Sequence, residues 1–136
     1  MLLSHPHFAG LSAFPLHRQM GLEYRSAADG RSHLAFEVGP DMLTPAPALH
    51  AGYLYAASDL ASYVALLSLL THDESAVTHD LHVSVMSSAR AGDRVDIRAE
   101  VVRRGRTLAF MDVRASCGDR LLSTARVTKS MMGPNR

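Results

Sequence analysis

Hydrophobic residues fill a nearly continuous run at residues 50–70, HAGYLYAASDLASYVALLSLL, the longest apolar stretch of the chain. At helical spacing the run is apolar on nearly every face, which predicts a helix that is buried on all sides. Its one carboxylate is Asp59, near the middle. Because an unpaired buried charge is costly, we expect Asp59 either to have a well-placed partner or to carry a function.

An apolar run of this length can also cross a bilayer, so the membrane alternative has to be weighed. Against it, Asp59 lies near the centre of the run, and no cluster of lysines or arginines flanks it. The remainder of the chain is charged and strand-like. We therefore predict a central helix inside a folded domain and no membrane partner.

Most of the remaining chain shows the period-two alternation of strands. Residues 22–28 and 31–38 predict two strands joined at Asp29-Gly30, a dipeptide typical of a type I′ hairpin. After the apolar run we expect four consecutive antiparallel strands, at residues 77–86, 93–103, 107–117 and 121–131. A short helix over residues 8–20 precedes the sheet, with Pro15 suited to a first turn or a break. The pattern predicts an α+β fold, with about six antiparallel strands around one long helix.

Length and composition limit the function classes. The 136 residues are expected to form one domain over 1–136. A net charge of +1 argues against a nucleic-acid partner, and the lone Cys117 indicates a reducing cytoplasm, with no signal peptide expected. The eight histidines lack the cysteine or carboxylate company of a metal site, so no metal is expected. Because one curved sheet cannot cover a helix on all sides, we expect at least a homodimer.

The order of two strands, a long helix and four strands resembles the hotdog fold. His50-Ala51-Gly52 followed by Asp59, nine residues after the histidine, is similar to the His-Gly-Gly…Asp motif of the phenylacetate-degradation-type (PaaI-like) acyl-CoA thioesterases. These belong to the 4-hydroxybenzoyl-CoA thioesterase superfamily. The segment VTHDLHVSVMSSARAGDRVDIRAEVVRRGRTLAFMDVRAS is also similar to that family's second half. The resemblance spans residues 15–131 and implies hydrolysis of an acyl-CoA thioester, with coenzyme A as part of the substrate and no separate cofactor.

The sequence departs from the family pattern at three positions. Ala51 replaces the first motif glycine, Thr44 stands where the family often has an asparagine, and Ser88 replaces a loop proline. The change at Ala51 matters least if only its backbone N–H is used. Thr44 lacks the amide that helps to hold water or a carbonyl, which predicts an altered rate or substrate range.

Thioester hydrolysis needs a base or nucleophile and donors for the developing oxyanion. Asp59 is the candidate base or nucleophile, and its alternative is a structural carboxylate. The backbone N–H groups of Ala51 and Gly52, at the positive end of the helix dipole, are the candidate donors. Ala51 and Asp59 are separated by roughly 12 Å along a helix, so we expect an active site shared between two antiparallel helices of a homo-oligomer.

Several further residues are weaker candidates, each with a structural alternative. Thr78 stands where some family members have a serine near the attacking water, although it suits an ordinary strand equally. His50 is expected either to orient the thioester or to hydrogen-bond at the helix start, and Thr44 is the weakest candidate. Four arginines in loops and turns are candidates for the phosphates of coenzyme A, with solvated turns as the alternative: Arg90, Arg103, Arg104 and Arg106.

Three functions remain open. An acyl-CoA thioesterase predicts loss of activity in Asp59→Asn with the fold intact. A hotdog protein that binds an acyl-CoA without hydrolysing it is the alternative, and the absence of asparagine at Thr44 favours it. A hotdog dehydratase or hydratase is third, since those enzymes pair a histidine with a carboxylate and the spacing from His50 to Asp59 fits the thioesterase pattern better.

Overall fold

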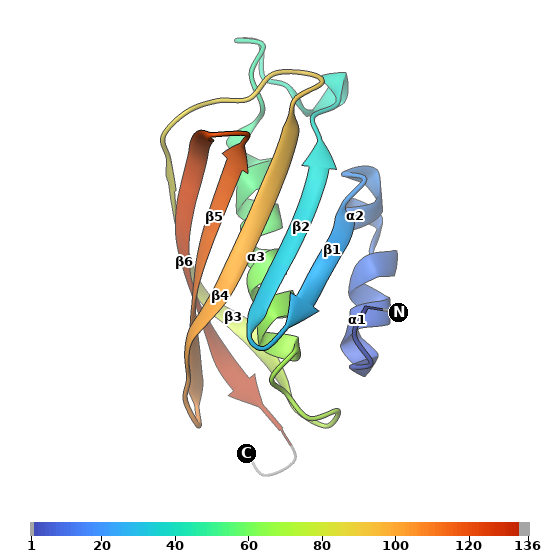
Figure 1. Ribbon diagram of the computed structural model, residues 1–136, viewed down its shortest axis with the longest axis vertical. Coiled ribbons are helices and arrows are strands. Elements are labelled where there is room, and N and C mark those ends of the chain that lie inside the picture. The colour runs from blue at the N-terminus through green and yellow to red at the C-terminus, as the bar shows by residue number, and fades with distance from the viewer. Residues whose placement is uncertain (1, 134–136) are drawn as a thin grey trace.

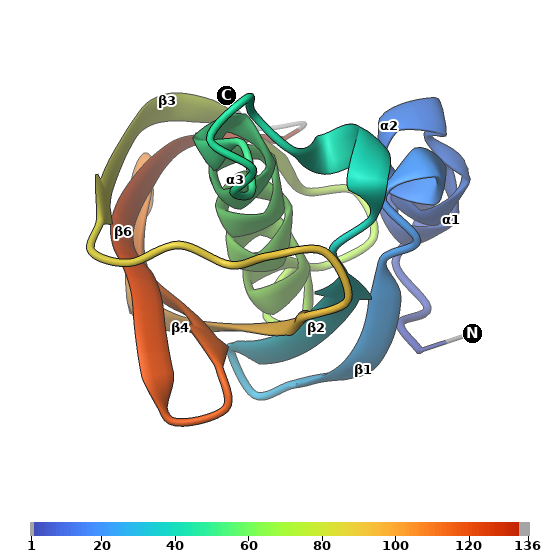
Figure 2. The same ribbon diagram turned by 90° about the horizontal axis from the view of Figure 1, so that it is seen from above.

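The long apolar run forms the helix α3 (Ala51–Leu67), and a six-stranded antiparallel sheet curls around it (Figures 1 and 2). This computed structural model describes residues 2–133. The predicted α+β architecture is confirmed. In chain order the other elements are α1 (Pro6–Ala13), α2 (Pro15–Gln19), β1 (Glu23–Ala28), β2 (Arg31–Glu37), the 3-10 helix η1 (Pro40–Met42), β3 (Ser75–Val85), β4 (Arg94–Arg104), β5 (Leu108–Cys117) and β6 (Arg120–Met132).

The N-terminal segment forms two short helices where the sequence predicts one. The chain is extended at Phe14, with φ −63° and ψ 132°, between α1 and α2. The ring of Pro15 disfavours helical backbone at the preceding residue, which explains the break. Gly21 ends α2 with a φ of 65°.

The hairpin between β1 and β2 has the predicted turn. Asp29 and Gly30 have φ values of 54° and 77°, and a type I′ turn requires positive φ at both central residues. The twist of this turn matches that of the flanking strands, so Ala28 pairs with Arg31 directly across it.

The second half of the chain contains the four predicted strands, but their order in the sheet differs from their order along the chain. The strand order is β1-β2-β4-β5-β6-β3, so β3 lies at one edge and pairs with β6, not with β4. The connection between β3 and β4 crosses the N-terminal end of α3 (Figure 2), where the Leu49 N–H donates to the Ala89 carbonyl at 2.8 Å. Ala89 is buried, so this connection packs as a crossover and cannot be a tight hairpin.

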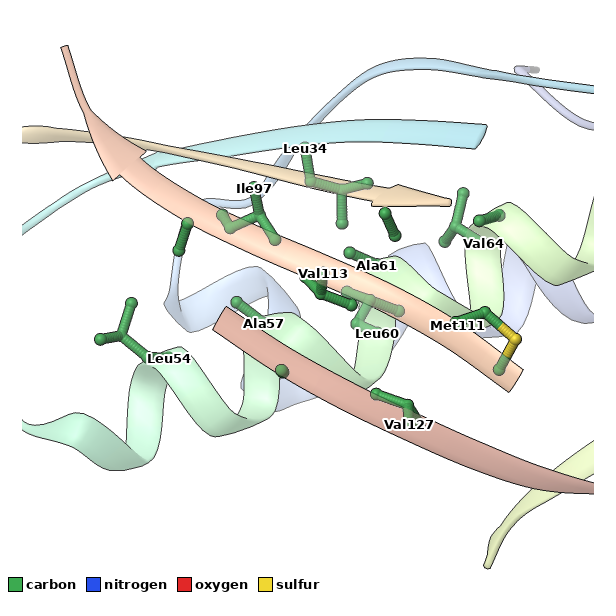
Figure 3. Packing of buried hydrophobic residues seen from close by; sticks show 14 of the residues in the cluster. Leu34, Leu54, Ala57, Leu60, Ala61, Val64, Ile97, Met111, Val113 and Val127 are labelled. Atoms are coloured by element: carbon green, nitrogen blue, oxygen red, sulfur yellow. The ribbon is translucent and has the colours of Figure 1, made fainter. Parts of the chain in front are cut away.

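The core lies between α3 and the concave face of the sheet. Figure 3 shows apolar side chains of α3 against those of β2, β4, β5 and β6; the labelled residues are Leu34, Leu54, Ala57, Leu60, Ala61, Val64, Ile97, Met111, Val113 and Val127. The small residues Ala57 and Ala61, both fully buried, allow the helix to approach the strands closely.

The prediction that α3 is buried on all sides is wrong for a single chain. Tyr55 is 42% exposed, and the side chain of Asp59 is 41% exposed. The sheet covers one side of the helix and the N-terminal helices cover part of another, which leaves this strip open. None of the helices within residues 2–133 combines the length and the apolarity required to cross a bilayer.

Candidate active site

Asp59 lies at the middle of α3 and has two polar partners. Its Oδ1 accepts a hydrogen bond from Thr78 Oγ1 at 2.7 Å and another from Lys129 Nζ at 3.1 Å. Lys129 Nζ also donates to Thr78 Oγ1 at 2.7 Å, so the three polar groups form a closed triangle. Of the two alternatives expected for Asp59, a partner or a function, the structure shows the partner, and two of the three groups are residues that the sequence indicated.

A β-bulge aims Thr78 at this cluster. Thr78 pairs directly with Lys129 across β3 and β6, and the register shifts between Thr78 and Asp80. Ala76 and Thr78, which precede the shift in the chain, face the helix. After the shift, Leu81 and every second residue following it face the helix. Because a bulge inserts one residue, it re-aims the side chains on one side of it. An unbroken strand with Leu81 inward would have turned Thr78 outward.

Lys129 is the member of this cluster that sequence reasoning missed. It lies on β6 with its side chain 4% exposed, and its Nζ lies 5.0 Å from the centroid of the Tyr63 ring. Burial lowers the pKa of Lys129, and the carboxylate of Asp59 opposes that shift. A signal was present, because Lys129 sits at the inward period-two position between Val127 and Met131.

The cluster forms the polar side of an open cleft of about 370 Å³. The opposite wall is apolar and comes from the N-terminal helices and the segment joining them, including Leu11, Phe14 and Leu16. Phe14 is 52% exposed although it is a large apolar residue, and it lines the cleft. The arrangement places a partly solvated carboxylate beside an apolar surface. The full lining is Leu11, Phe14, Leu16, His17, Ala56, Asp59, Leu60, Tyr63, Ala76, Thr78 and Lys129.

The predicted oxyanion donors lie at the start of α3, about two turns from Asp59. His50 caps the helix, because its Nδ1 accepts a hydrogen bond from the Gly52 N–H at 2.8 Å. This is the structural alternative stated for His50, and it occupies one of the two predicted donors. The Ala51 N–H has no acceptor within residues 2–133, so Ala51 keeps an available donor at the positive end of the helix.

Thr44 lies in the loop before α3 and serves that loop. Its Oγ1 accepts from the Ala46 N–H at 3.3 Å, and its own N–H donates to the Ala48 carbonyl at 2.8 Å. The described residues give Thr44 no contact with the Asp59 cluster, so one chain does not bring these two candidates together.

The four candidate arginines fall at two ends of the molecule. Arg90 precedes β4, whereas Arg103 and Arg104 are its last two residues and Arg106 follows them. An 11-residue strand spans roughly 35 Å. Within one chain Arg90 and the other three therefore cannot contact the same phosphate group.

Arg104 is already engaged at its end of β4. It forms an ion pair with Glu74, which is half-buried like Arg104, and donates to the Gly105 carbonyl. A hydrogen bond from the Thr71 N–H, helped by Arg104, holds the pKa of Glu74 below its usual range.

Within residues 2–133, no group of three or more His, Cys, Asp or Glu side chains is placed to hold a metal ion.

Comparison with known proteins places the chain in a family. Residues 47–124, more than half of the chain, match the model of the thioesterase superfamily. The chain is 30% identical over 110 residues to human acyl-coenzyme A thioesterase 13, covering 78% of this chain and 76% of the relative.

Solved structures agree with this result. A variant of the phenylacetic acid degradation protein PaaI from Thermus thermophilus is 28% identical, with a TM-score of 0.79 over 85% of this chain and 97% of that one. A hypothetical thioesterase protein from Streptococcus pneumoniae, determined with coenzyme A, is 25% identical, with a TM-score of 0.76 over 82% and 89% of the two chains. The helix-in-sheet architecture and the family match together show that the chain belongs to the thioesterase superfamily as a PaaI-like hotdog protein.

Proposed function

We propose that the protein hydrolyses an acyl-CoA thioester to a free acid and coenzyme A, with Asp59 as the general base or nucleophile. One observation carries this proposal: Asp59 presents a carboxylate, 41% exposed, at the polar side of a cleft whose opposite wall is apolar. The superfamily match and the name of the human relative support the reaction class. The coenzyme A in the pneumococcal neighbour's crystals supports the substrate class.

The reaction requires a water oxygen, or Asp59 itself, to form a bond to the acyl carbon while the carbon–sulfur bond breaks. If Asp59 attacks, the resulting anhydride is hydrolysed by water, which releases the free acid and restores the carboxylate, while the coenzyme A thiolate takes a proton from that water. As general base, Asp59 takes a proton from water as that water attacks, and the proton finally resides on the thiol of coenzyme A or on solvent. The thioester oxygen gains negative charge during attack, and a backbone N–H at a helix start stabilises such charge. Ala51 is our candidate for this donor because its N–H has no protein acceptor within residues 2–133.

A shared active site follows from the separation of these groups. Ala51 and Asp59 lie roughly 12 Å apart along α3, too far for both to contact one carbonyl. A second copy with α3 antiparallel to the first would bring its Ala51 toward Asp59. The open strip of α3 around Tyr55 and the free edge of β3, with Val77 and Val85 exposed, support a homo-oligomer. The unpaired thiol of Cys117 fits the cytoplasm as its compartment.

The cleft also indicates the kind of acyl group. Leu11, Phe14 and Leu16 offer apolar surface beside Asp59. An aliphatic or aryl acyl group placed against these side chains would be removed from water while its thioester carbon lies near the carboxylate. We therefore propose an apolar acyl group.

The alternative is a protein that binds an acyl-CoA without hydrolysing it. Two observations favour it: Lys129 gives Asp59 the partner that a structural carboxylate requires, and His50 occupies the Gly52 N–H. In that case coenzyme A thioesters bind, and no free thiol is released.

The deciding experiment measures release of free thiol from a panel of aliphatic and aryl acyl-CoAs by the wild type and by Asp59→Asn. Asp112→Asn is the matched control, since Asp112 is an exposed carboxylate paired with Arg126 on the outer face of the sheet. We expect turnover in the wild type and the control, and its loss in Asp59→Asn. Equal turnover in all three proteins would refute the role of Asp59, and binding without turnover in the wild type would favour the alternative.

A further inference from the structure

Lys129 is the most deeply buried charged group of the described chain, and its burial needs an explanation. An ammonium group removed from water costs several kcal/mol unless it is paired and hydrogen-bonded. An ammonium group has three N–H donors. The cost is offset only in part here, because the described residues give Lys129 Nζ two hydrogen-bond acceptors, Asp59 Oδ1 and Thr78 Oγ1. An apolar residue at this inward position of β6, flanked by the buried Val127 and Met131, would avoid the cost altogether.

The contacts of the cluster are asymmetric at the carboxylate. Both donors, Thr78 Oγ1 and Lys129 Nζ, are directed to Oδ1 of Asp59. Within residues 2–133 Oδ2 receives no hydrogen bond. One oxygen is therefore anchored by the sheet, and the other keeps its lone pairs available in the cleft.

The anchor is itself well supported. Thr78 and Lys129 are direct partners across β3 and β6, so the sheet holds their backbones in register. The face of the Tyr63 ring, one helical turn beyond Asp59, lies 5.0 Å from Lys129 Nζ and adds a cation–π contact. The ammonium group is thus limited to one place, which is what an orienting role requires.

We propose that Lys129 is a positioning residue of the reaction: with Thr78 it holds Oδ1 of Asp59 and reserves Oδ2 for the proton of the attacking water. The proposal rests on the proposed function, in which Asp59 is the reactive carboxylate. Lys129 acts through Asp59, whose Oδ1 it holds.

The pH dependence of the reaction provides a readout that a purely structural lysine would not affect. A variant without Lys129 has no ammonium group to lose, so the alkaline decline of kcat that follows deprotonation of Lys129 should be absent from it. At alkaline pH the wild type loses the ammonium proton early, because burial lowers the pKa of Lys129. The other titratable groups facing this site are Tyr63, His7, which hydrogen-bonds to Tyr63, and His17 in the cleft wall.

The test compares Lys129→Met with the wild type in acyl-CoA hydrolysis from acidic to alkaline pH. Methionine retains an unbranched side chain of similar length and removes the charge. Arg126→Met is the matched control, because Arg126 lies three residues earlier on β6 and faces outward toward Asp112. For Lys129→Met we expect kcat to fall about 100-fold, as misplacement of a reacting group by about 1 Å can cost. The alkaline decline of kcat should be absent from Lys129→Met, with the control unchanged.

A second variant keeps the test decisive if Lys129→Met does not fold. Thr78→Val removes the hydroxyl that links Lys129 to Asp59 and leaves the charge in place. We expect it to lower kcat and to retain the alkaline decline, because Lys129 keeps its ammonium group.

The outcomes separate this proposal from the proposed function. If Asp59→Asn is inactive while Lys129→Met keeps the wild-type kcat and pH profile, the role of Lys129 is refuted and that of Asp59 stands. If the wild type hydrolyses nothing, or Asp59→Asn is as active as the wild type, the proposed function fails and the positioning role fails with it. A large loss of kcat in Lys129→Met with the same alkaline decline as the wild type would show a structural lysine and would also overturn the proposal.

Discussion

Substitutions at the two ends of the Asp59–Lys129 ion pair are expected to change stability in opposite directions. The reason is their different burial: the side chain of Lys129 is 4% exposed and that of Asp59 is 41% exposed. Removing the exposed partner leaves a buried charge without its counter-ion, whereas removing the buried partner leaves a carboxylate that water can solvate. The usual view that either substitution breaks a favourable pair does not apply here.

Asp59→Asn should destabilise the fold. Asparagine still offers an oxygen to Thr78 and Lys129, but the hydrogen bond from the ammonium group loses its charged acceptor, and such bonds contribute about 1.5–3 kcal/mol. The loss has an upper limit, because without Asp59 the pKa of Lys129 falls further and the ammonium can release its proton. We therefore expect a decrease in the free energy of unfolding of about 2 kcal/mol.

Lys129→Met should leave stability unchanged or raise it by about 1 kcal/mol, because an apolar side chain replaces a buried charge. The gain depends on pH, and its sign follows from the lowered pKa of Lys129. Between the folded-state and unfolded-state pKa values the unfolded chain binds more protons, so the stability of the wild type rises with pH in that window. The advantage of the methionine variant is therefore full at neutral pH and shrinks at alkaline pH.

Urea denaturation at fixed protein concentration, followed from pH 7 into the alkaline range, measures these differences. Arg126→Met serves as the control, since its exposed ion pair with Asp112 contributes little. The double variant Asp59→Asn with Lys129→Met should recover the stability lost in Asp59→Asn. A Lys129→Met protein that is less stable than the wild type by more than about 1 kcal/mol would refute the reasoning, because the pair would then be stabilising as a whole.

Three further predictions concern the turn, the helix cap and the cleft. Gly30→Ala should cost about 1–2 kcal/mol in urea denaturation, because Gly30 has a φ of 77° and the added Cβ would lie 3.1 Å from Leu69 Cδ1; unchanged stability would contradict this. His50→Ala should cost about 1 kcal/mol by releasing the Gly52 N–H, with kcat retained if His50 is only a cap. Phe14→Ser should raise KM about fivefold for long-chain acyl-CoAs and leave acetyl-CoA unaffected, since half of the Phe14 ring is available to an acyl group; equal effects on both substrates would exclude it from the acyl site.

Patterns confined to short stretches of sequence were sufficient for much of the fold. The apolar run predicts α3 because few sequences of that length stay apolar outside a buried helix, and Asp29-Gly30 predicts its turn because few residue pairs tolerate two positive φ values. The solitary carboxylate in the run likewise singled out Asp59. These features depend on neighbours along the chain, and so the sequence contains them directly.

No such local pattern specifies the order of the strands in the sheet. The alternation of β3 predicts a strand but does not state its partner. In the structure β3 pairs with β6, and its connection to β4 packs the buried Ala89 at the start of α3. Arg104 and Glu74 are 30 residues apart in sequence. Their ion pair likewise depends on how the last residues of β4 meet the segment that joins α3 to β3.

The sequence by itself therefore determined the class of fold, the central helix and the carboxylate on which the proposed chemistry is centred. Only the tertiary structure decided what surrounds that carboxylate. A one-residue bulge next to Thr78 turns its hydroxyl inward, and the pairing of β3 with β6 sets Lys129 beside it, 70 residues from Asp59. Such a cluster forms because strand register fixes distances between residues remote in sequence, and no local pattern specifies that register.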